Sequence, residues 1–232
     1  MPFPEIHTQM VMQMKLKYPC LVLDHDDTVV ASEIAVNYPC FLEALEKFRP
    51  GEYMDHPEFV RWCFKYEFTD FLRIRYNFTP EEGREEYEMW KEYAKTHIPP
   101  VCGGIREIIL EQKRRGGLVC VASLSSRETI LRDYDLHIGI RPDLIFCKDD
   151  PVFKPDPYPL KRIMETYHLS PAQLLVVDDL KTGLDMAKSA GVPIAAALWC
   201  RQDAPEIIDY MTGRCEFAFH TTGELYEFLF GT

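Results

Sequence analysis

The stretch 20-CLVLDHDDTVV-30 decides how this sequence is interpreted. An apolar run leads directly into an acidic cluster in which Asp24, Asp26 and Asp27 lie within four positions. Aspartate is depleted in strands, and each pair of like charges about 4 Å apart costs roughly 4 kcal/mol at an effective dielectric constant of about 20. A bound cation, a proton or exposure to water must therefore offset this repulsion.

Composition narrows the class of protein. The chain has 232 residues, of which 47% are hydrophobic, so it can bury a sizeable core. The net charge of -11 and the scattered basic residues argue against a nucleic-acid surface. No apolar run approaches the roughly 20 residues needed to span a bilayer, and the N-terminus lacks a signal-peptide pattern. The eight cysteines form no Cys-x-x-Cys pair, so we expect reduced thiols in a cytoplasmic protein that binds neither nucleic acid nor membrane.

Short apolar runs alternate with helical patterns over most of the chain. The expected strands are 20–23, 118–122, 144–146, 174–177 and 193–198. This alternation predicts an α/β fold with a Rossmann-like three-layer core and a parallel sheet. At the start of one of the helices, Ser125 and Glu128 have the spacing of a capping box.

Residues 33–99 interrupt this rhythm with helical patterns rich in aromatic residues, which predict an inserted α-helical domain. We therefore divide the chain into an N-terminal extension with a possible extra strand (1–17), an α/β core (18–32 and 100–232) and a helical insertion (33–99). The exit from the insertion, 98-IPPVCGG-104, is rich in proline and glycine and is typical of a linker.

Polar residues follow four of the expected strands. The acidic cluster follows the first strand, Ser123 the second, and Asp178 and Asp179 the fourth, while Lys154 lies in a proline-bounded loop after the third. Ligands of open parallel sheets bind outside the carboxyl ends of the strands, so these groups should meet at one edge. Carboxylates without histidine or cysteine partners favour Mg²⁺, which would offset the repulsion among the acids. Ser123 and Lys154 would then bind an anion such as phosphate beside the metal ion.

Three other interpretations of the acidic cluster fit this sequence less well. A calcium-binding EF-hand requires glycine at the sixth position and glutamate at the twelfth, where this chain has Val29 and Ala35. A response-regulator receiver is a much shorter module, and its acidic pair precedes the phospho-acceptor, whereas the pair here comes last. A solvated loop would explain one acidic pair but not four polar clusters that each follow a strand.

With these motifs in order, the sequence resembles the haloacid dehalogenase-like superfamily of phosphohydrolases, in the branch of phosphatases and β-phosphoglucomutase-like enzymes with a helical cap. The Asp-x-Asp-x-Thr motif falls on residues 24–28, the second motif on Ser123, the Lys-Pro-x-Pro loop on 154–157 and the acidic pair on 178–179. The match in order, spacing and strand context spans residues 20 to about 198. The chain departs from the family at Asp27, where most members have glycine, and at His25, which replaces a usually apolar residue.

The resemblance implies a magnesium-dependent hydrolase of small phosphomonoesters. Asp24 would attack phosphorus and become an aspartyl phosphate, and Asp26 would act as general acid and base. Ser123 and Lys154 would bind the phosphoryl oxygens. The residues expected to hold Mg²⁺ are Asp24, Asp26 (through its backbone carbonyl), Asp178 and Asp179.

Several alternatives stay open on sequence alone. His25 is either a structural histidine or part of the site. Arg73 and Arg75 either bind a second anionic group of the substrate or are solvated helix charges. A phosphomutase of the β-phosphoglucomutase type and a non-catalytic phosphate-binding protein are the competing functions, although the aromatic insertion favours a closed apolar lid and hydrolysis. The expected partner is a small phosphorylated metabolite, and the expected assembly is a monomer or a homodimer.

Overall fold

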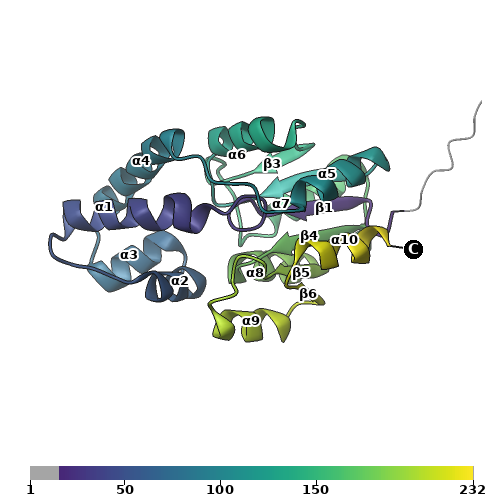
Figure 1. Ribbon diagram of the computed structural model, residues 1–232. Helices are drawn as coiled ribbons and strands as arrows, with labels where there is room; N and C mark the ends of the chain where they lie inside the picture. The colour runs from purple at the N-terminus through teal and green to yellow at the C-terminus, as the bar shows by residue number, and fades with distance from the viewer. Residues whose placement is uncertain (1–15, 232) are drawn as a thin grey trace, which may run out of the picture.

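A single parallel sheet forms the centre of the computed structural model, which describes residues 16–231 (Figure 1). The strand order is β3-β2-β1-β4-β5-β6. The strands are β1 (Cys20–Leu23), β2 (Leu118–Ala122), β3 (Leu144–Phe146), β4 (Leu174–Asp178), β5 (Ile194–Ala197) and β6 (Phe217–Phe219). All five expected strands are present. The expected N-terminal extension lies outside the described residues, except for its last two positions.

The central strand β1 sets the register of the sheet. Val22 lies opposite Cys120 of β2 on one side and Val176 of β4 on the other. Both faces of β1 are buried, which explains why its sequence is apolar throughout instead of alternating. β6 was not predicted from the sequence, because it is short and its residues are only half-buried.

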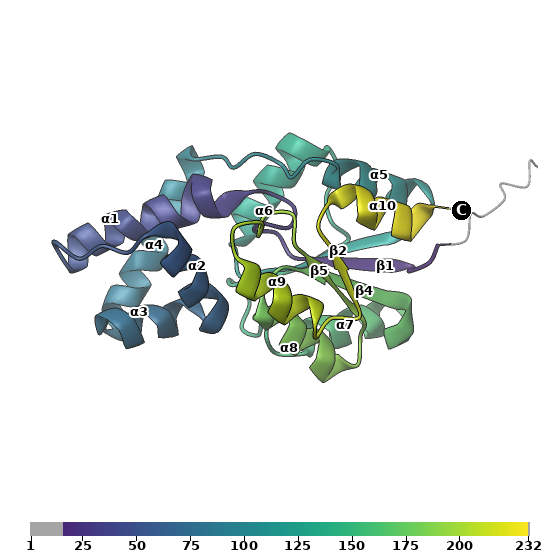
Figure 2. The same cartoon turned by 60° about the horizontal axis from the view of Figure 1, so that its bottom comes forward.

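Helices cover both faces of the sheet (Figures 1 and 2). On one face α5 (Ile105–Arg114), α6 (Arg127–Asp133) and α10 (Thr222–Phe230) contribute to a buried cluster with Leu21 and Leu23. On the other face a second cluster forms around Cys20 and Val22, and the helices that contribute to it are α7 (Tyr158–Tyr167), α8 (Lys181–Ala190) and α9 (Pro205–Thr212). Two short helices, the π-helix η2 (Tyr134–Ile138) and the 3-10 helix η3 (Pro171–Gln173), are the remaining helical elements of the α/β core. The predicted three-layer α/β fold is thus confirmed.

All regular elements of the inserted segment are helices. It consists of η1 (Glu33–Asn37), α1 (Tyr38–Phe48), α2 (His56–Lys65), α3 (Phe68–Tyr76) and α4 (Pro80–Thr96). Its aromatic residues form a core of their own, which includes Phe41, Phe59 and Phe71. Figures 1 and 2 both show these helices beyond one end of the sheet. We call the segment from η1 to α4 the helical insertion.

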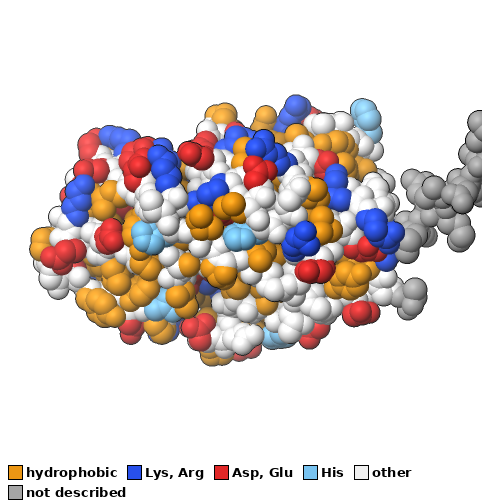
Figure 3. Space-filling model, turned by 45° about the horizontal axis from the view of Figure 1, so that its top comes forward, with side chains coloured by type: hydrophobic (Ala, Val, Ile, Leu, Met, Phe, Trp, Pro, Cys, Tyr) orange, Lys and Arg blue, Asp and Glu red, His pale blue; other side chains and the backbone are white. Residues whose placement is uncertain are grey.

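The surface mixes charges of both signs. In Figure 3, Lys and Arg side chains alternate with Asp and Glu over the face in view, and hydrophobic side chains lie between them. Within residues 16–231, none of the helices combines the length and the apolar character that crossing a membrane requires.

Candidate active site

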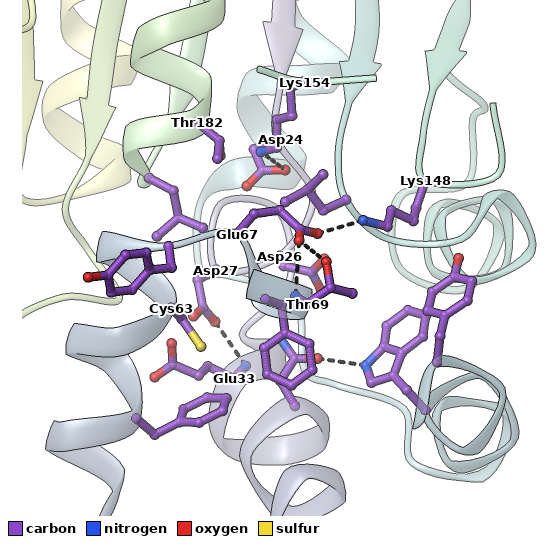
Figure 4. A pocket seen from close by; sticks show the side chains of 18 of the residues that line it. Asp24, Asp26, Asp27, Glu33, Cys63, Glu67, Thr69, Lys148, Lys154 and Thr182 are labelled. Carbon is purple, nitrogen blue, oxygen red and sulfur yellow. Dashed lines mark hydrogen bonds and ion pairs between the residues drawn. The ribbon is translucent and has the colours of Figure 1, made fainter. Parts of the chain in front are cut away.

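The strand ends bring the predicted polar residues together. Asp24 directly follows β1, Asp178 is the last residue of β4, and Asp179 comes next in the chain. The backbone N–H of Asp24 donates to the carbonyl oxygen of Val177 at 2.9 Å, which ties the two strand ends to each other. A pocket opens between this edge of the sheet and the helical insertion (Figure 4).

Lys154 forms a buried ion pair with the carboxylate of Asp24. Its side chain is 1% exposed, and its Nζ lies 2.9 Å from Asp24 Oδ1 and 2.8 Å from Asp178 Oδ2. Burial alone would lower the pKa of Lys154, but the carboxylates of Asp178 and Asp24 outweigh it and raise the pKa above its ordinary value. Lys154 therefore stays protonated and offers a fixed positive charge beside Asp24.

Three buried carboxylates form a candidate metal site. Asp24, Asp178 and Asp179 offer oxygen atoms that all lie within 4.8 Å of one another. Burial, reinforced by the charge of Asp24, raises the pKa of Asp178 and of Asp179 to about 8. Among residues 16–231, none forms a hydrogen bond with the buried Oδ1 of Asp179. An all-oxygen site of this kind fits Mg²⁺, and a bound cation would favour the ionised carboxylates.

The backbone beside this site is shaped around Asp178. Its Oδ1 accepts a hydrogen bond from the backbone N–H of Leu180 at 2.9 Å. Gly183, in the first turn of α8, packs so closely that a Cβ there would overlap the Asp178 carboxylate. Any larger residue would displace that side chain, so glycine allows α8 to start directly beside the metal site.

Two serines orient Asp26, the predicted general acid and base. The half-buried Asp26 lines the pocket. Its Oδ1 accepts from the hydroxyl of Ser32 at 2.6 Å, and its Oδ2 accepts from the hydroxyl of Ser125 at 2.7 Å. The sequence pattern assigned Ser125 to a helix cap, and this was wrong by one residue. The cap of α6 is Ser126, whose Oγ accepts from the backbone of Thr129, and this leaves Ser125 free to bind Asp26.

Asp27 belongs to a buried ionic cluster that the sequence did not predict. Its backbone has a φ of 53°, the left-handed conformation that glycine adopts freely and that aspartate tolerates. Its Oδ2 lies 3.0 Å from Arg201, which is 4% exposed. The Nε of Arg201 also donates to Asp179 at 2.8 Å, and its Nη1 donates to Glu33 at 2.6 Å. Arg201 follows β5 in the chain and joins the first motif, the metal site and the helical insertion.

This cluster has an excess of negative charge. Five buried carboxylates, those of Asp24, Asp27, Glu33, Asp178 and Asp179, surround two buried cations, Lys154 and Arg201. Burial raises the pKa of Asp27 to about 7, although Arg201 acts in the opposite direction. A divalent cation would remove most of the remaining negative charge. It would thereby offset the repulsion among the carboxylates of the first motif.

Ser123 and His25 are both buried, but neither lines the pocket. Ser123 follows β2, and its Oγ accepts from the backbone N–H of Ser125 at 3.1 Å, while its neighbour Leu124 does line the pocket. The Nε2 of His25 lies 3.0 Å from Asp133 Oδ2, and its ring lies against Tyr134. His25 thus connects the first motif to α6 from within the core.

Arg73 and Arg75 lie away from the pocket lining. The Arg73 side chain is 62% exposed and pairs with Asp70 at 2.9 Å, and the guanidinium of Arg75 lies 4.9 Å from the ring centre of Tyr76. These contacts match solvated helix charges, and the structure gives no support to a second anion site at these two residues.

The helical insertion supplies much of the pocket wall. We call its lining residues the insertion wall. The aromatic members are Phe59, Tyr66, Phe68, Tyr87 and Trp90, and the acidic members are Glu33, Glu67 and Glu86. Thr182 of α8 lies on the core side close to Asp24 (Figure 4), and its hydroxyl forms no hydrogen bond with any residue that the structure describes. The cavity encloses about 180 Å³, which suits a small substrate.

A family model described as haloacid dehalogenase-like hydrolase matches residues 21–197, from β1 to the end of β5. The chain belongs to this family. The match includes the helical insertion and the edge of the sheet where the carboxylates meet, and it confirms the resemblance seen in the sequence motifs.

Solved structures of several family members share the fold. A haloacid dehalogenase-like family protein from Streptococcus pneumoniae has a TM-score of 0.74 at 16% identity, covering 91% of this chain and 98% of its own. CbbY from Rhodobacter sphaeroides, in complex with xylulose-(1,5)bisphosphate, has a TM-score of 0.69 at 16% identity, covering 90% and 96%. A predicted phosphoglycolate phosphatase from Haemophilus somnus has a TM-score of 0.71 at 16% identity, covering 93% and 99%. None of the curated proteins matches the chain.

Proposed function

We propose that this family member is a magnesium-dependent hydrolase of small phosphomonoesters that works through an aspartyl phosphate. The observation that carries the proposal is the setting of Asp24. Its carboxylate lies 2.9 Å from the Nζ of Lys154 and close to the carboxylates of Asp178 and Asp179, while Asp26 is held in the same pocket by two serine hydroxyls. This arrangement offers a nucleophile, a fixed cation, a metal site and an acid–base group around one small cavity.

The residues support a two-step reaction. A carboxylate oxygen of Asp24 attacks phosphorus, the bond from phosphorus to the ester oxygen breaks, and Asp26 donates a proton to the departing oxygen. Asp26 then removes a proton from a water molecule that attacks phosphorus, which releases phosphate and regenerates Asp24. Lys154 stabilises the negative charge on the phosphoryl oxygens.

The carboxylates of Asp24, Asp178 and Asp179 would hold Mg²⁺, together with the backbone carbonyl of Asp26 that the family resemblance implies. When bound, the ion would reduce the repulsion between Asp24 and the incoming phosphate. The chain itself holds these carboxylates in place. Gly183 packs closely against Asp178, and the guanidinium of Arg201 donates a hydrogen bond to Asp179.

Hydrolysis is favoured over transfer to a second sugar hydroxyl. Asp26 could activate either a water molecule or a hydroxyl group, so the choice depends on the insertion wall. Five of the eleven residues of that wall are aromatic, and the faces of aromatic rings offer few hydrogen bonds to the hydroxyl groups of a sugar. A non-catalytic role would leave the ion pair of Asp24 with Lys154 and the orientation of Asp26 by Ser32 without an explanation.

The experiment is turnover of p-nitrophenyl phosphate by the purified chain in chelator, in Mg²⁺ and in Ca²⁺. We expect activity with Mg²⁺ and much less with Ca²⁺, which prefers looser and higher coordination. Asp24→Asn should abolish turnover, whereas Asp135→Asn, at an exposed ion pair with Arg141, should retain it. Full activity in chelator, or in Asp24→Asn, would contradict the proposal.

Turnover in heavy-oxygen water separates hydrolysis from a mutase reaction. Hydrolysis places one labelled oxygen in each released phosphate. An isomeric phosphate ester with negligible labelled phosphate would favour the mutase.

A further inference from the structure

One acid of the insertion wall has no partner. Glu86 lies on α4, is 3% exposed and lines the pocket. Among the described residues, none forms a hydrogen bond or an ion pair with its carboxyl group. Buried polar groups are almost always paired, so an unpartnered acid that faces a cavity points to a missing ligand.

The cations of the pocket are already committed to other carboxylates. Lys148 pairs with Glu67 at 2.6 Å, and Lys154 pairs with Asp24 at 2.9 Å (Figure 4). Arg201 is held in the buried cluster described above. Glu86 would therefore repel a second anionic group of a substrate, because the described residues of the pocket include no uncommitted cation to balance the two negative charges. A cationic group of the substrate could instead pair with the Glu86 carboxylate.

The chemistry around Glu86 also suits a cation. Tyr87 is its neighbour in the chain, Trp90 lies one turn further along α4, and the rings of these two residues stack with their centres 5.8 Å apart. Both line the cavity together with Tyr66 and Phe68 from the adjoining helices. Aromatic rings beside a carboxylate are the recurring environment for organic ammonium groups in proteins.

The electrostatics of Glu86 agree with this assignment. Burial, with Glu67 nearby, raises the pKa of Glu86 to about 8, although the charge of Lys148 acts in the opposite direction. A negative charge there is unfavourable while the pocket is empty, and an adjacent positive charge would stabilise it. An ammonium group would thus interact with a carboxylate that, within residues 16–231, forms no ion pair of its own, because Lys148 is paired with Glu67.

We propose that the substrate is a phosphomonoester whose alcohol portion carries an organic ammonium group, which Glu86 and the aromatic side chains of the insertion wall bind. This inference rests on the proposed phosphatase function and narrows its substrate class. In the complex, Asp24 would face the phosphoryl group and Glu86 the ammonium group of the same small molecule.

The test compares esters that differ only in charge. Choline phosphate is compared with its neutral carbon isostere, in which carbon replaces the quaternary nitrogen, and ethanolamine phosphate is compared with propyl phosphate. We expect kcat/KM to favour the charged member of at least one pair by roughly tenfold or more, which corresponds to a desolvated cation–π contact together with an ion pair.

Variants connect this preference to the site. Glu86→Gln should reduce the charged-to-neutral ratio to below about threefold, and Trp90→Leu should lower it independently through loss of the ring. Glu85→Gln is the matched control, because Glu85 lies on the exposed side of the same helix and pairs with Lys47 outside the pocket. It should leave the ratio unchanged.

The outcomes distinguish this inference from the function on which it rests. Magnesium-dependent hydrolysis with equal kcat/KM within both pairs, or a ratio that survives Glu86→Gln, overturns the ammonium site alone. If no phosphomonoester is hydrolysed with Mg²⁺, p-nitrophenyl phosphate included, both the proposed function and the ammonium site are overturned.

Discussion

Replacing Arg201 by methionine should strongly destabilise the protein. Arg201 is the cation to which Asp27, Glu33 and Asp179 are paired, and all of these groups are buried. Removing one partner of a buried ion pair leaves uncompensated charge and costs about 3–5 kcal/mol. For a chain of this size that loss lowers the melting temperature by on the order of 10 °C.

The cost of Arg201→Met should depend on pH. Without the guanidinium, the pKa values of Asp27 and Asp179, which are already raised in the folded protein, rise further, and the lowered pKa of Glu33 rises as well. Folding then requires more proton uptake, so the destabilisation should be smaller at pH 5 and larger at pH 8. Adding Asp27→Gly should recover about 1 kcal/mol or more, because it removes one buried carboxylate and relieves the left-handed backbone at that position.

Urea unfolding measures these changes. The control is Arg73→Met, which removes an exposed pair with Asp70 and should cost less than about 1 kcal/mol. If Arg201→Met costs no more than Arg73→Met, or if Asp27→Gly destabilises both backgrounds equally, then the buried carboxylates are not held by Arg201 and the electrostatic reasoning is wrong.

Four further substitutions test other parts of the site and its surroundings. Asp26→Asn should lower kcat by roughly 10²–10⁴-fold but still release about one equivalent of p-nitrophenol in a burst, since this leaving group needs no proton; linear kinetics without a burst would argue against it. Ser125→Ala should lower kcat roughly tenfold by freeing Asp26, while Ser126→Ala should keep kcat and lose about 1 kcal/mol of stability as a helix cap; the reverse pattern would contradict these assignments. The hydrogen bond to Glu33 raises the pKa of His56, so the stability it adds is present below about pH 6.5 and is lost as the pH rises past the raised value. The difference in unfolding free energy between wild type and His56→Gln should then be larger at pH 6 than at pH 9, and an equal difference would refute the link.

Local patterns made the core predictable. Each strand was a short apolar run ended by polar or turn-forming residues, and parallel packing dictates that groups after such strands meet at one edge. Asp24, Asp178 and Lys154 were therefore placed correctly from position alone, and the structure puts them within ion-pair distance. The order of the motifs then identified the family.

Residues that act across long distances in the sequence were not predictable. Arg201 is a single basic residue in a loop after β5, and its partners Asp27 and Glu33 lie far earlier in the chain. The one feature of the sequence that could have indicated Arg201 is the acid at position 27, where most family members have glycine. A carboxylate that is buried at such a position requires a cation as its partner.

Helix surfaces misled the sequence analysis in a different way. Glu86 lies in a stretch crowded with charged residues, 79-TPEEGREEYEMWKEYAK-95, where most acids are solvated. Only the packing of α4 against the pocket shows that this acid is buried while its neighbour Glu85 is exposed. For Arg73 the sequence leaves a binding role and a solvated helix charge both open, and the structure supports the solvated charge, because the side chain is exposed and pairs with Asp70.

The measurement that tests the central claim most directly is chemical trapping of the aspartyl phosphate. The enzyme is mixed with Mg²⁺ and p-nitrophenyl phosphate, quenched in acid, and reduced with borohydride, which converts a phosphorylated aspartate to homoserine. Mass spectrometry of the peptide that contains residues 20–30 should show this conversion at Asp24, and only when Mg²⁺ is present. Conversion at another carboxylate, or none during active turnover, would contradict the assignment of Asp24 as the nucleophile.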